Sequence, residues 1–312
     1  MRLRKLAAIV MVGTMVFSLT ACGGSGGNGN TAGTAAGETK KTEEEVGNPG
    51  EWTDNKDAVV LQVGFENSIS EPVGQGWVKA QEIIREKSGG TMAIEVYPDS
   101  QLGDKSSLID SMLLGENVCT LADGAFYADY GVPDFGIVFG PFLFDSWDQC
   151  WTLIESDWYK EQCAKLEEKG LKLIASNWIY GERHTLTNVP VNTVDDLKGL
   201  KIRVPSNEIQ SKGFDVLGAT STGMALGDVY QALQTKTIDG AENPLATLYG
   251  RKLHEVAQYL ILDGHVKNFT TWVVSADWFN SLTEEQQNWL IETATEAGEY
   301  NNEVQQAAEA DY

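Results

Sequence analysis

The pattern of apolar and polar residues along the middle of the chain predicts alternating strands and helices. Three short, mostly apolar segments have the composition of strands buried on both faces of a sheet: 58–65, 91–97 and 118–122. Amphipathic, helix-like patterns separate them, over 73–87 and 104–114. This order predicts a parallel sheet whose ligand site lies at the carboxyl ends of the strands.

The alternation continues toward the end of the chain. Further strands are predicted over 171–178, 200–204, 260–262 and 269–274. Further helices are predicted over 146–155, 158–169, 209–217 and 227–234. Thr283, with Gln286 three residues later, makes a capping box for a long final helix. We therefore expect an α/β fold of two lobes, with a hinge that the backbone crosses more than once, which suits closure around a ligand.

The start of the chain has a different composition. Basic residues precede an apolar stretch over 6–17, which is too short to span a bilayer as a permanent helix and is typical of an export signal. The residues Leu19–Cys22 then resemble the cleavage box of bacterial lipoproteins, in which the thiol of Cys22 takes a diacylglycerol group. A plain secretion signal with an incidental cysteine is the alternative.

Residues 22–57 are rich in glycine and polar side chains and have too little apolar surface to form a core. We expect a signal peptide over 1–21 and a flexible, lipid-anchored tether over 22–57. The folded body would then sit at the outer face of the cytoplasmic membrane.

Charge and cysteine content exclude several classes of function. A net charge of −22 argues against nucleic acid as a partner. Cysteine is scarce, and we expect Cys119, Cys150 and Cys163 to be free, buried thiols. The histidines and cysteines have no metal-ligand spacing, so neither a metal nor a cofactor is expected.

Four segments carry a family resemblance. They are YPDSQLG at 97–103, PFLF at 141–144, KGLKIRVP at 198–205, and VYQALQT through DGAENP at 229–244. In this order they resemble the signature segments of the DctP-type solute-binding proteins, which serve TRAP transporters. The resemblance implies a two-lobe, periplasmic-binding-protein-like fold (type II-like) with a hinge and a long C-terminal helix. It also implies a receptor that delivers an organic acid to a small and a large integral membrane subunit, and not an enzyme.

The lobes are expected to divide the body unevenly. Lobe I would comprise 58–180 plus about 269–312, and lobe II would comprise 181–268.

Arg203 is the central candidate for ligand binding. It lies at the end of a predicted strand, between Ile202 and Val204 and just before Pro205. A guanidinium in this place would match the two oxygens of a carboxylate. The resemblance places the carboxylate-binding arginine of the family here. By the same resemblance, Arg183 is a second basic residue beside the ligand, although it could instead form an internal salt bridge. The resemblance also implies that Asn243 points into the crevice, although it could instead cap the helical segment that begins at Pro244.

The first lobe supplies candidates in the loops that follow its strands: Glu66, Asn67, Asp104, Lys105 and Asp123. Asp104 could instead cap the next helix, and Lys105 could be solvated. Glu66 and Asp123 would repel an anion unless the ligand offers hydroxyl donors, so we interpret them as acceptors for sugar hydroxyls. Trp178 and Tyr180 could cover a pyranose ring, with core packing as the alternative for Trp178, and Leu226 could form an apolar wall.

These candidates favour a receptor for a hydroxylated organic acid, a hexuronate such as glucuronate or galacturonate. A C4-dicarboxylate or another sugar acid, sialate or aldonate, is the alternative ligand. An exported lyase or glycosidase that uses Glu66 and Asp123 as an acid/base pair is a different class of function. A sensory or structural lipoprotein that binds the same acid is a third.

Overall fold

The computed structural model describes residues 55–311, except the side chain of residue 310. The predicted signal peptide, Cys22 and most of the predicted tether lie outside these residues. The strands are β1 (Val59–Gly64), β2 (Met92–Tyr97), β3 (Val118–Ala122), β4 (Leu171–Thr187), β5 (Lys201–Val204), β6 (Thr220–Gly223), β7 (Gly240–Pro244) and β8 (Tyr259–Ser275). The helices are α1 (Pro72–Ser88), α2 (Lys105–Leu113), α3 (Gly124–Asp129), α4 (Trp147–Ile154), α5 (Asp157–Glu167), α6 (Glu208–Val216), α7 (Val229–Gln234), α8 (Leu245–Gly250), α9 (Ala276–Ser281) and α10 (Glu284–Asp311). Short 3₁₀ segments are η2 (Pro133–Phe139), η3 (Val194–Leu197), η4 (Leu226–Asp228) and η5 (Leu253–Glu255).

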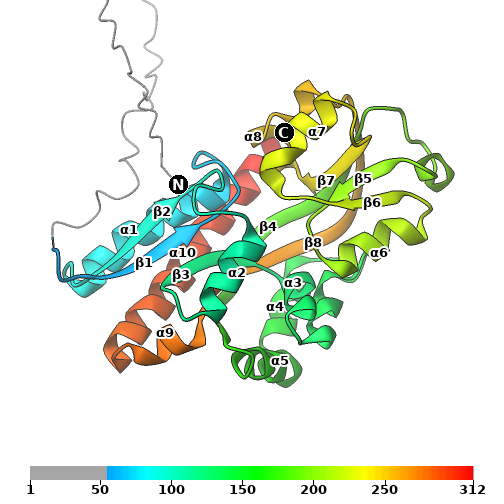
Figure 1. Ribbon diagram of the computed structural model, residues 1–312. Helices are drawn as coiled ribbons and strands as arrows, with labels where there is room; N and C mark the ends of the chain where they lie inside the picture. The colour runs from blue at the N-terminus through cyan, green and yellow to red at the C-terminus, as the bar shows by residue number, and fades with distance from the viewer. Residues whose placement is uncertain (1–54, 312) are drawn as a thin grey trace, which may run out of the picture. The chain divides into compact units, whose positions relative to one another are not determined.

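The described strands form one sheet in the order β2-β1-β3-β8-β4-β7-β5-β6 (Figure 1). At one end β1 pairs in parallel with β2 and β3, which confirms the predicted parallel β-α-β-α-β unit. At the other end β5 pairs in parallel with β6 and β7. The two parallel halves are joined in the middle by antiparallel pairing of β4 with β8.

These two central strands are longer than the sequence pattern indicated. The strand predicted to end at Trp178 continues to Thr187, and the strands predicted over 260–262 and 269–274 are one strand, β8. Polar residues interrupt the apolar pattern because each strand crosses from one half of the sheet to the other. The strands β6 and β7 and the helix α3 were not predicted at all.

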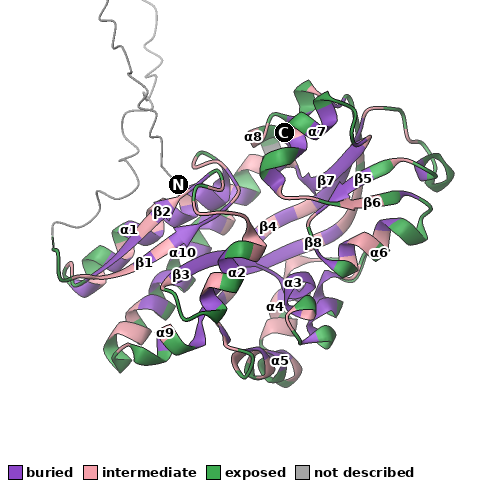
Figure 2. Ribbon diagram, in the orientation of Figure 1, coloured by how far each residue is buried: buried purple, intermediate pink, exposed green. Residues whose placement is uncertain are grey.

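Three tryptophans form the centre of the core beneath the first half of the sheet. The Trp77 ring lies 5.2 Å from that of Trp178 and 4.1 Å from that of Trp272, measured between ring centroids. The indole N–H of Trp178 donates to the carbonyl of Ala294 in α10 at 2.8 Å. Figure 2 shows buried residues following the central strands, with exposed residues gathered on the outer helices.

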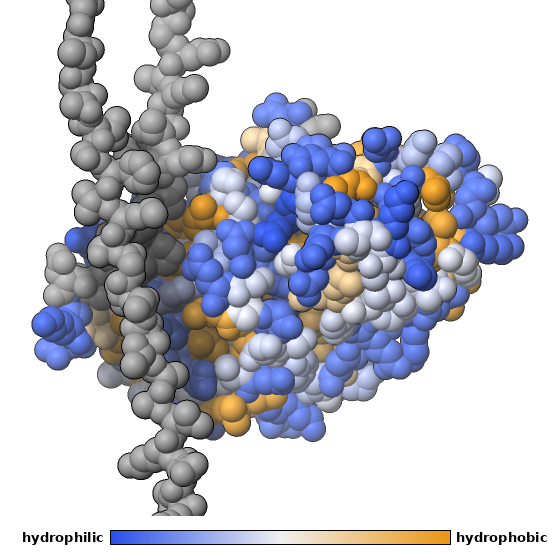
Figure 3. All heavy atoms as spheres, turned by 45° about the horizontal axis from the view of Figure 1, so that its top comes forward, coloured by the Kyte–Doolittle hydropathy of each residue, from blue (hydrophilic) through white to orange (hydrophobic). Residues whose placement is uncertain are grey.

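The described surface is largely hydrophilic, and the state of the thiols agrees in part with the prediction from the sequence. Hydrophilic side chains predominate on the face seen in Figure 3, where apolar ones form separate patches. Among residues 55–311, no helix is long and apolar enough to cross a membrane. Cys119, Cys150 and Cys163 are free, as expected, but Cys163 is half-buried instead of buried.

Buried charges link the central strands β4, β7 and β8. Arg183 Nε and Nη2 donate to the two carboxylate oxygens of Glu242 at 2.5 and 2.7 Å. His265 lies between Glu242 and Asp263, with ring nitrogens 3.3 and 3.2 Å from their oxygens. Burial would lower the pKa of His265, but its two carboxylate partners outweigh burial and raise the pKa to about 9. Burial would likewise raise the pKa of Glu242, and Arg183 and His265 lower it to about 2.

This arrangement predicts a loss of stability at alkaline pH. The folded-state pKa of His265 exceeds its ordinary value of 6.5, so the folded state binds the proton more tightly than the unfolded state. The stabilisation is complete below pH 6.5 and is lost as pH rises toward about 9. In urea unfolding across this range, we expect the free energy of unfolding to fall more steeply for the wild type than for His265→Gln. Parallel curves would contradict the prediction.

Candidate functional site

A polar cavity lies where the two parallel halves of the sheet face each other across β4 and β8. Its free volume in this structure is small, about 20 Å³. Its lining residues are Glu66, Lys105, Asp123, Phe126, Tyr180, Arg183, Arg203, Pro205, Leu226, Asn243, Asn268 and Thr270. Eight of the eleven ligand-binding residues predicted from the sequence are in this set.

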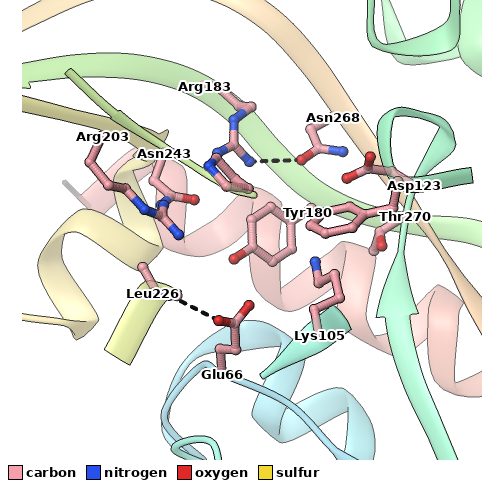
Figure 4. A pocket seen from close by; sticks show the side chains of 12 residues that line it. Glu66, Lys105, Asp123, Tyr180, Arg183, Arg203, Leu226, Asn243, Asn268 and Thr270 are labelled. Atoms are coloured by element: carbon pink, nitrogen blue, oxygen red, sulfur yellow. Dashed lines mark hydrogen bonds between the residues drawn. The ribbon is translucent and has the colours of Figure 1, made fainter. Parts of the chain in front are cut away.

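Arg203 reaches the cavity from the end of β5. Its side chain is 2% exposed, and its Nε and Nη2 donate to the carbonyl of Met224 at 2.9 and 2.6 Å. Its remaining nitrogen, Nη1, is buried and has no hydrogen-bond partner in the described chain. Burial lowers the pKa of Arg203, and the nearby Glu66 and Glu242 partly oppose this. The site therefore contains a guanidinium with one donor edge already fixed and the other available to a ligand. Figure 4 shows Arg203 among the other residues that line the cavity.

Arg183 also lines the cavity, but its side-chain donors are already paired within the protein. Besides its pair with Glu242, its Nη1 donates to the Asn268 side-chain oxygen at 2.9 Å. The internal salt bridge that the sequence left as an alternative is therefore present, although Arg183 also lines the cavity. Its positive charge is matched by Glu242, whereas no acid pairs directly with Arg203 in residues 55–311.

A bulge in β4 brings Tyr180 and Arg183 to the same cavity. Residues three apart would point to opposite faces of a regular strand. The pairing of β4 with β8 shifts register between Ile179 and Gly181, and Gly181 has a φ of 132°. A side chain at this position would also place its Cβ 2.6 Å from that of Pro244. Only glycine fits here, and the irregular backbone turns both side chains inward.

Lys105 and two acids line the wall opposite Arg203 (Figure 4). The Lys105 ammonium lies 4.8 Å from the centroid of the Phe126 ring and makes no hydrogen bond or ion pair within residues 55–311. Burial lowers the pKa of Lys105, while Asp123 and Glu66 act in the opposite direction. Asp123 is 6% exposed and accepts from the Ala125 N–H at 3.1 Å, and burial raises its pKa.

Glu66 and Asn243 complete the polar lining. A Glu66 carboxylate oxygen accepts from the backbone N–H of Leu226 at 2.9 Å, across the cavity. Asn243 is 2% exposed, and its amide forms no hydrogen bond with the described residues. It does not cap α8, since the helix follows Pro244 without a side-chain cap. Its amide therefore supplies a donor and an acceptor to the cavity.

Three predicted residues do not line the cavity. Trp178 is fully buried in the tryptophan core, so its predicted role beside a sugar ring is wrong. Asp104 caps α2 by accepting from the Ser107 N–H at 2.8 Å, and it borders only a small adjacent hollow. Asn67 donates to Glu71, Tyr180 and Thr247 at 2.6, 3.1 and 3.1 Å, which supports the wall behind Tyr180.

Sequence reasoning missed four lining residues: Phe126, Pro205, Asn268 and Thr270. Asn268 and Thr270 lie on β8, on either side of the apolar Phe269. Their separation by two residues could have identified them as a pair, because it places both side chains on one face of a strand. Phe126 gave no such signal, since α3 was not predicted.

The arrangement combines donors for an anion with acceptors for hydroxyl groups. Arg203 Nη1, the Lys105 ammonium and the Asn243 amide can donate, and the carboxylates of Glu66 and Asp123 can accept. Among the described side chains, no group of three or more His, Cys, Asp or Glu residues could hold a metal ion. The donors and acceptors that line the cavity can recognise a small molecule by hydrogen bonds and charge.

Comparisons with known proteins agree with this geometry. The family model of DctP, bacterial extracellular solute-binding protein family 7, matches residues 63–312. A TRAP periplasmic solute-binding protein from Ochrobacterium anthropi, solved with bound L-fuconate, is 37% identical. The match covers 81% of this chain and 84% of that one, with a TM-score of 0.79.

Two further relatives extend the comparison. A TRAP protein from Actinobacillus succinogenes, solved with bound L-galactonate, is 33% identical, with a TM-score of 0.79 over 81% of this chain and 83% of that one. The 2,3-diketo-L-gulonate-binding periplasmic protein of Escherichia coli is 30% identical over 78% of this chain and 74% of its own.

These relatives are solute-binding receptors and not enzymes. The two solved structures share the two-lobe fold of this chain. The lyase and glycosidase alternatives are therefore set aside. The matched residues cover the end of β1, the strands β2 to β8 and every residue that lines the cavity. The chain belongs to the DctP family of bacterial extracellular solute-binding proteins, the solute receptors of TRAP transporters.

Proposed function

We propose that this receptor binds a hydroxylated organic acid, a hexuronate such as glucuronate or galacturonate, with Arg203 holding its carboxylate. The observation that carries the proposal is the buried Nη1 of Arg203, which has no partner in the described chain and borders the cavity. A buried cationic donor without a partner is costly, and a ligand carboxylate would supply the missing partner. Glu66 and Asp123 would then accept from hydroxyl groups of the same ligand.

An acyclic aldonate is the second candidate, and the relatives favour it. The proteins that share 37% and 33% identity with this chain were solved with L-fuconate and L-galactonate, which are both aldonates. A relative from Xanthobacter autotrophicus at 25% identity was solved with galacturonate, a uronate. Each of these acids has one carboxylate and several hydroxyls, which matches the mixture of donors and acceptors in the cavity.

We further propose that the ligand is enclosed by closure of lobe I, residues 58–180 plus about 269–312, on lobe II, residues 181–268. Polar contacts already cross between these segments beside the cavity. Glu66 accepts from Leu226, Asn67 donates to Thr247, and Arg251 Nη1 lies 2.5 Å from Asp99 Oδ1. Such contacts form only when the lobes are together, and they would stabilise the closed state along with the ligand.

The remaining parts of the proposal concern location and partners. We propose that Cys22 carries a lipid that anchors the receptor to the outer face of the cytoplasmic membrane, through the tether over 22–57. The sequence of Leu19–Cys22 supports this. The receptor would release its acid to the small and large integral subunits of a TRAP transporter.

A thermal-shift screen tests the class of ligand. We expect glucuronate, galacturonate or galactonate to raise the melting temperature, because each offers a carboxylate to Arg203 and hydroxyls to Glu66 and Asp123. Succinate and malate should have little effect, since they lack enough hydroxyls to satisfy the acids. Stabilisation by succinate or malate without a shift from any sugar acid would contradict the proposal.

Substitution of Arg203 tests the carboxylate clamp. Arg203→Ala should abolish detectable binding in calorimetry, because removing one partner of a buried charged pair costs about 2–5 kcal/mol. Arg85→Ala, an exposed arginine on α1, is the matched control and should bind normally. Both variants should keep the circular-dichroism spectrum of the wild type. Unchanged affinity in Arg203→Ala would show that the ligand is held elsewhere.

A further inference from the structure

Glu66 occupies an unusual place among the charged residues of the cavity. It follows β1, yet one of its carboxylate oxygens accepts from the Leu226 N–H, 160 residues later in the chain. Its other oxygen makes no hydrogen bond within residues 55–311, and Figure 4 shows it directed toward the cavity. The bond to Leu226 therefore fixes the orientation of a carboxylate that still faces the ligand.

Glu66 also lies within the electrostatic reach of both cations in the cavity. It favours the charged form of Lys105 on one wall and of Arg203 on the other. The charge of Arg183 is balanced in part by Glu242, which accepts from it through both carboxylate oxygens. The lining thus presents two cations, Lys105 and Arg203, against the two acids Glu66 and Asp123.

This balance of charges limits the negative charge that a ligand bound in the cavity can carry. One carboxylate can bind Arg203 at its free donor edge. A second carboxylate, at the far end of a six-carbon chain, would meet the wall formed by Glu66, Asp123 and Lys105. There the single ammonium is already flanked by two acids, so the added negative charge would face like charges in a closed, low-dielectric space.

We propose that Glu66 is a specificity-determining residue that restricts this receptor to acids with one carboxylate. One carboxylate oxygen is fixed by the Leu226 N–H. The other accepts a hydrogen bond from a hydroxyl at the uncharged end of the ligand, and it repels a carboxylate in the same place. This inference rests on the proposed function, since it assumes that Arg203 holds the first carboxylate.

Galactonate and galactarate provide the test, because they differ only in a terminal hydroxymethyl group or carboxylate. Dissociation constants of both are measured by calorimetry for the wild type, Glu66→Gln and Glu66→Ala. In the wild type, galactarate should bind at least about tenfold more weakly than galactonate. Glu66→Gln should reduce this ratio about tenfold, because a glutamine oxygen can still accept from Leu226 while the charge is gone. Glu66→Ala should weaken galactonate itself, because it also loses the bond across the cavity.

The matched control is Glu82→Gln, which removes an exposed charge on α1 that pairs with Lys79. It should leave both constants unchanged. Equal affinity of the wild type for the two acids, or an unchanged ratio in Glu66→Gln, would overturn the role of Glu66 while leaving the receptor function intact. If the wild type binds C4 dicarboxylates and neither sugar acid, the proposed function fails, and the inference fails with it.

Discussion

The burial of the Arg203 guanidinium is the constraint on which the rest of the site depends. Two of its nitrogens are satisfied by one carbonyl, that of Met224, and the third borders the cavity without a partner in the described chain. Moving a cation from water into a protein interior costs several kcal/mol unless opposite charge and hydrogen bonds compensate. The structure compensates Arg203 only in part, by the field of Glu66 and Glu242. An anion at Nη1 would complete the compensation, and this makes binding favourable at this point.

Arg183 shows the opposite solution to the same problem. Glu242 binds it through two oxygens, Asn268 takes a third donor, and His265 and Asp263 extend the network away from the cavity. A pair this complete holds β4, β7 and β8 in a fixed relation, so that Arg183 forms a rigid wall. One arginine therefore positions the site, and the other leaves a donor for the ligand.

The sequence predicted the parts of the fold and site that depend on local patterns. The parallel unit around β1 was visible because its short apolar segments are separated by amphipathic helices. The sequence also predicted the site residues Arg203, Glu66 and Asp123. Each lies at or just after the end of a predicted strand, and the edge of a parallel sheet brings such positions together. Asp104 satisfied the same rule, but its side chain caps α2. Strand ends and helix starts coincide in this fold, so an acid there has two possible roles that the sequence alone does not separate.

The full length of β4 and β8 could not be predicted from local sequence patterns. For the same reason Asn268 and Thr270 were missed as lining residues, and Trp178 was assigned to the cavity instead of the core. Each strand crosses both halves of the sheet, so its burial pattern changes along its length and no single periodicity describes it. Trp178 lies in the part that packs under α1 and α10, whereas Tyr180, two residues later, reaches the cavity. The bulge at Gly181 sets this boundary through a register shift between two distant strands. Such a shift is a property of the pairing, and an isolated segment does not encode it.

A chain with a net charge of −22 can hold an anion, as we propose, because of the distances involved. Exposed charges are screened within about 8 Å at physiological salt, so most surface acids exert little force on a ligand inside the cavity. The Arg203 and Lys105 cations and the Glu66 and Asp123 carboxylates line the cavity itself, where charges are screened less than at the surface. The acidic surface can therefore vary while the cavity keeps its balance of charges. Under the proposed function, that balance, and not the total charge of the chain, would determine which acid is bound.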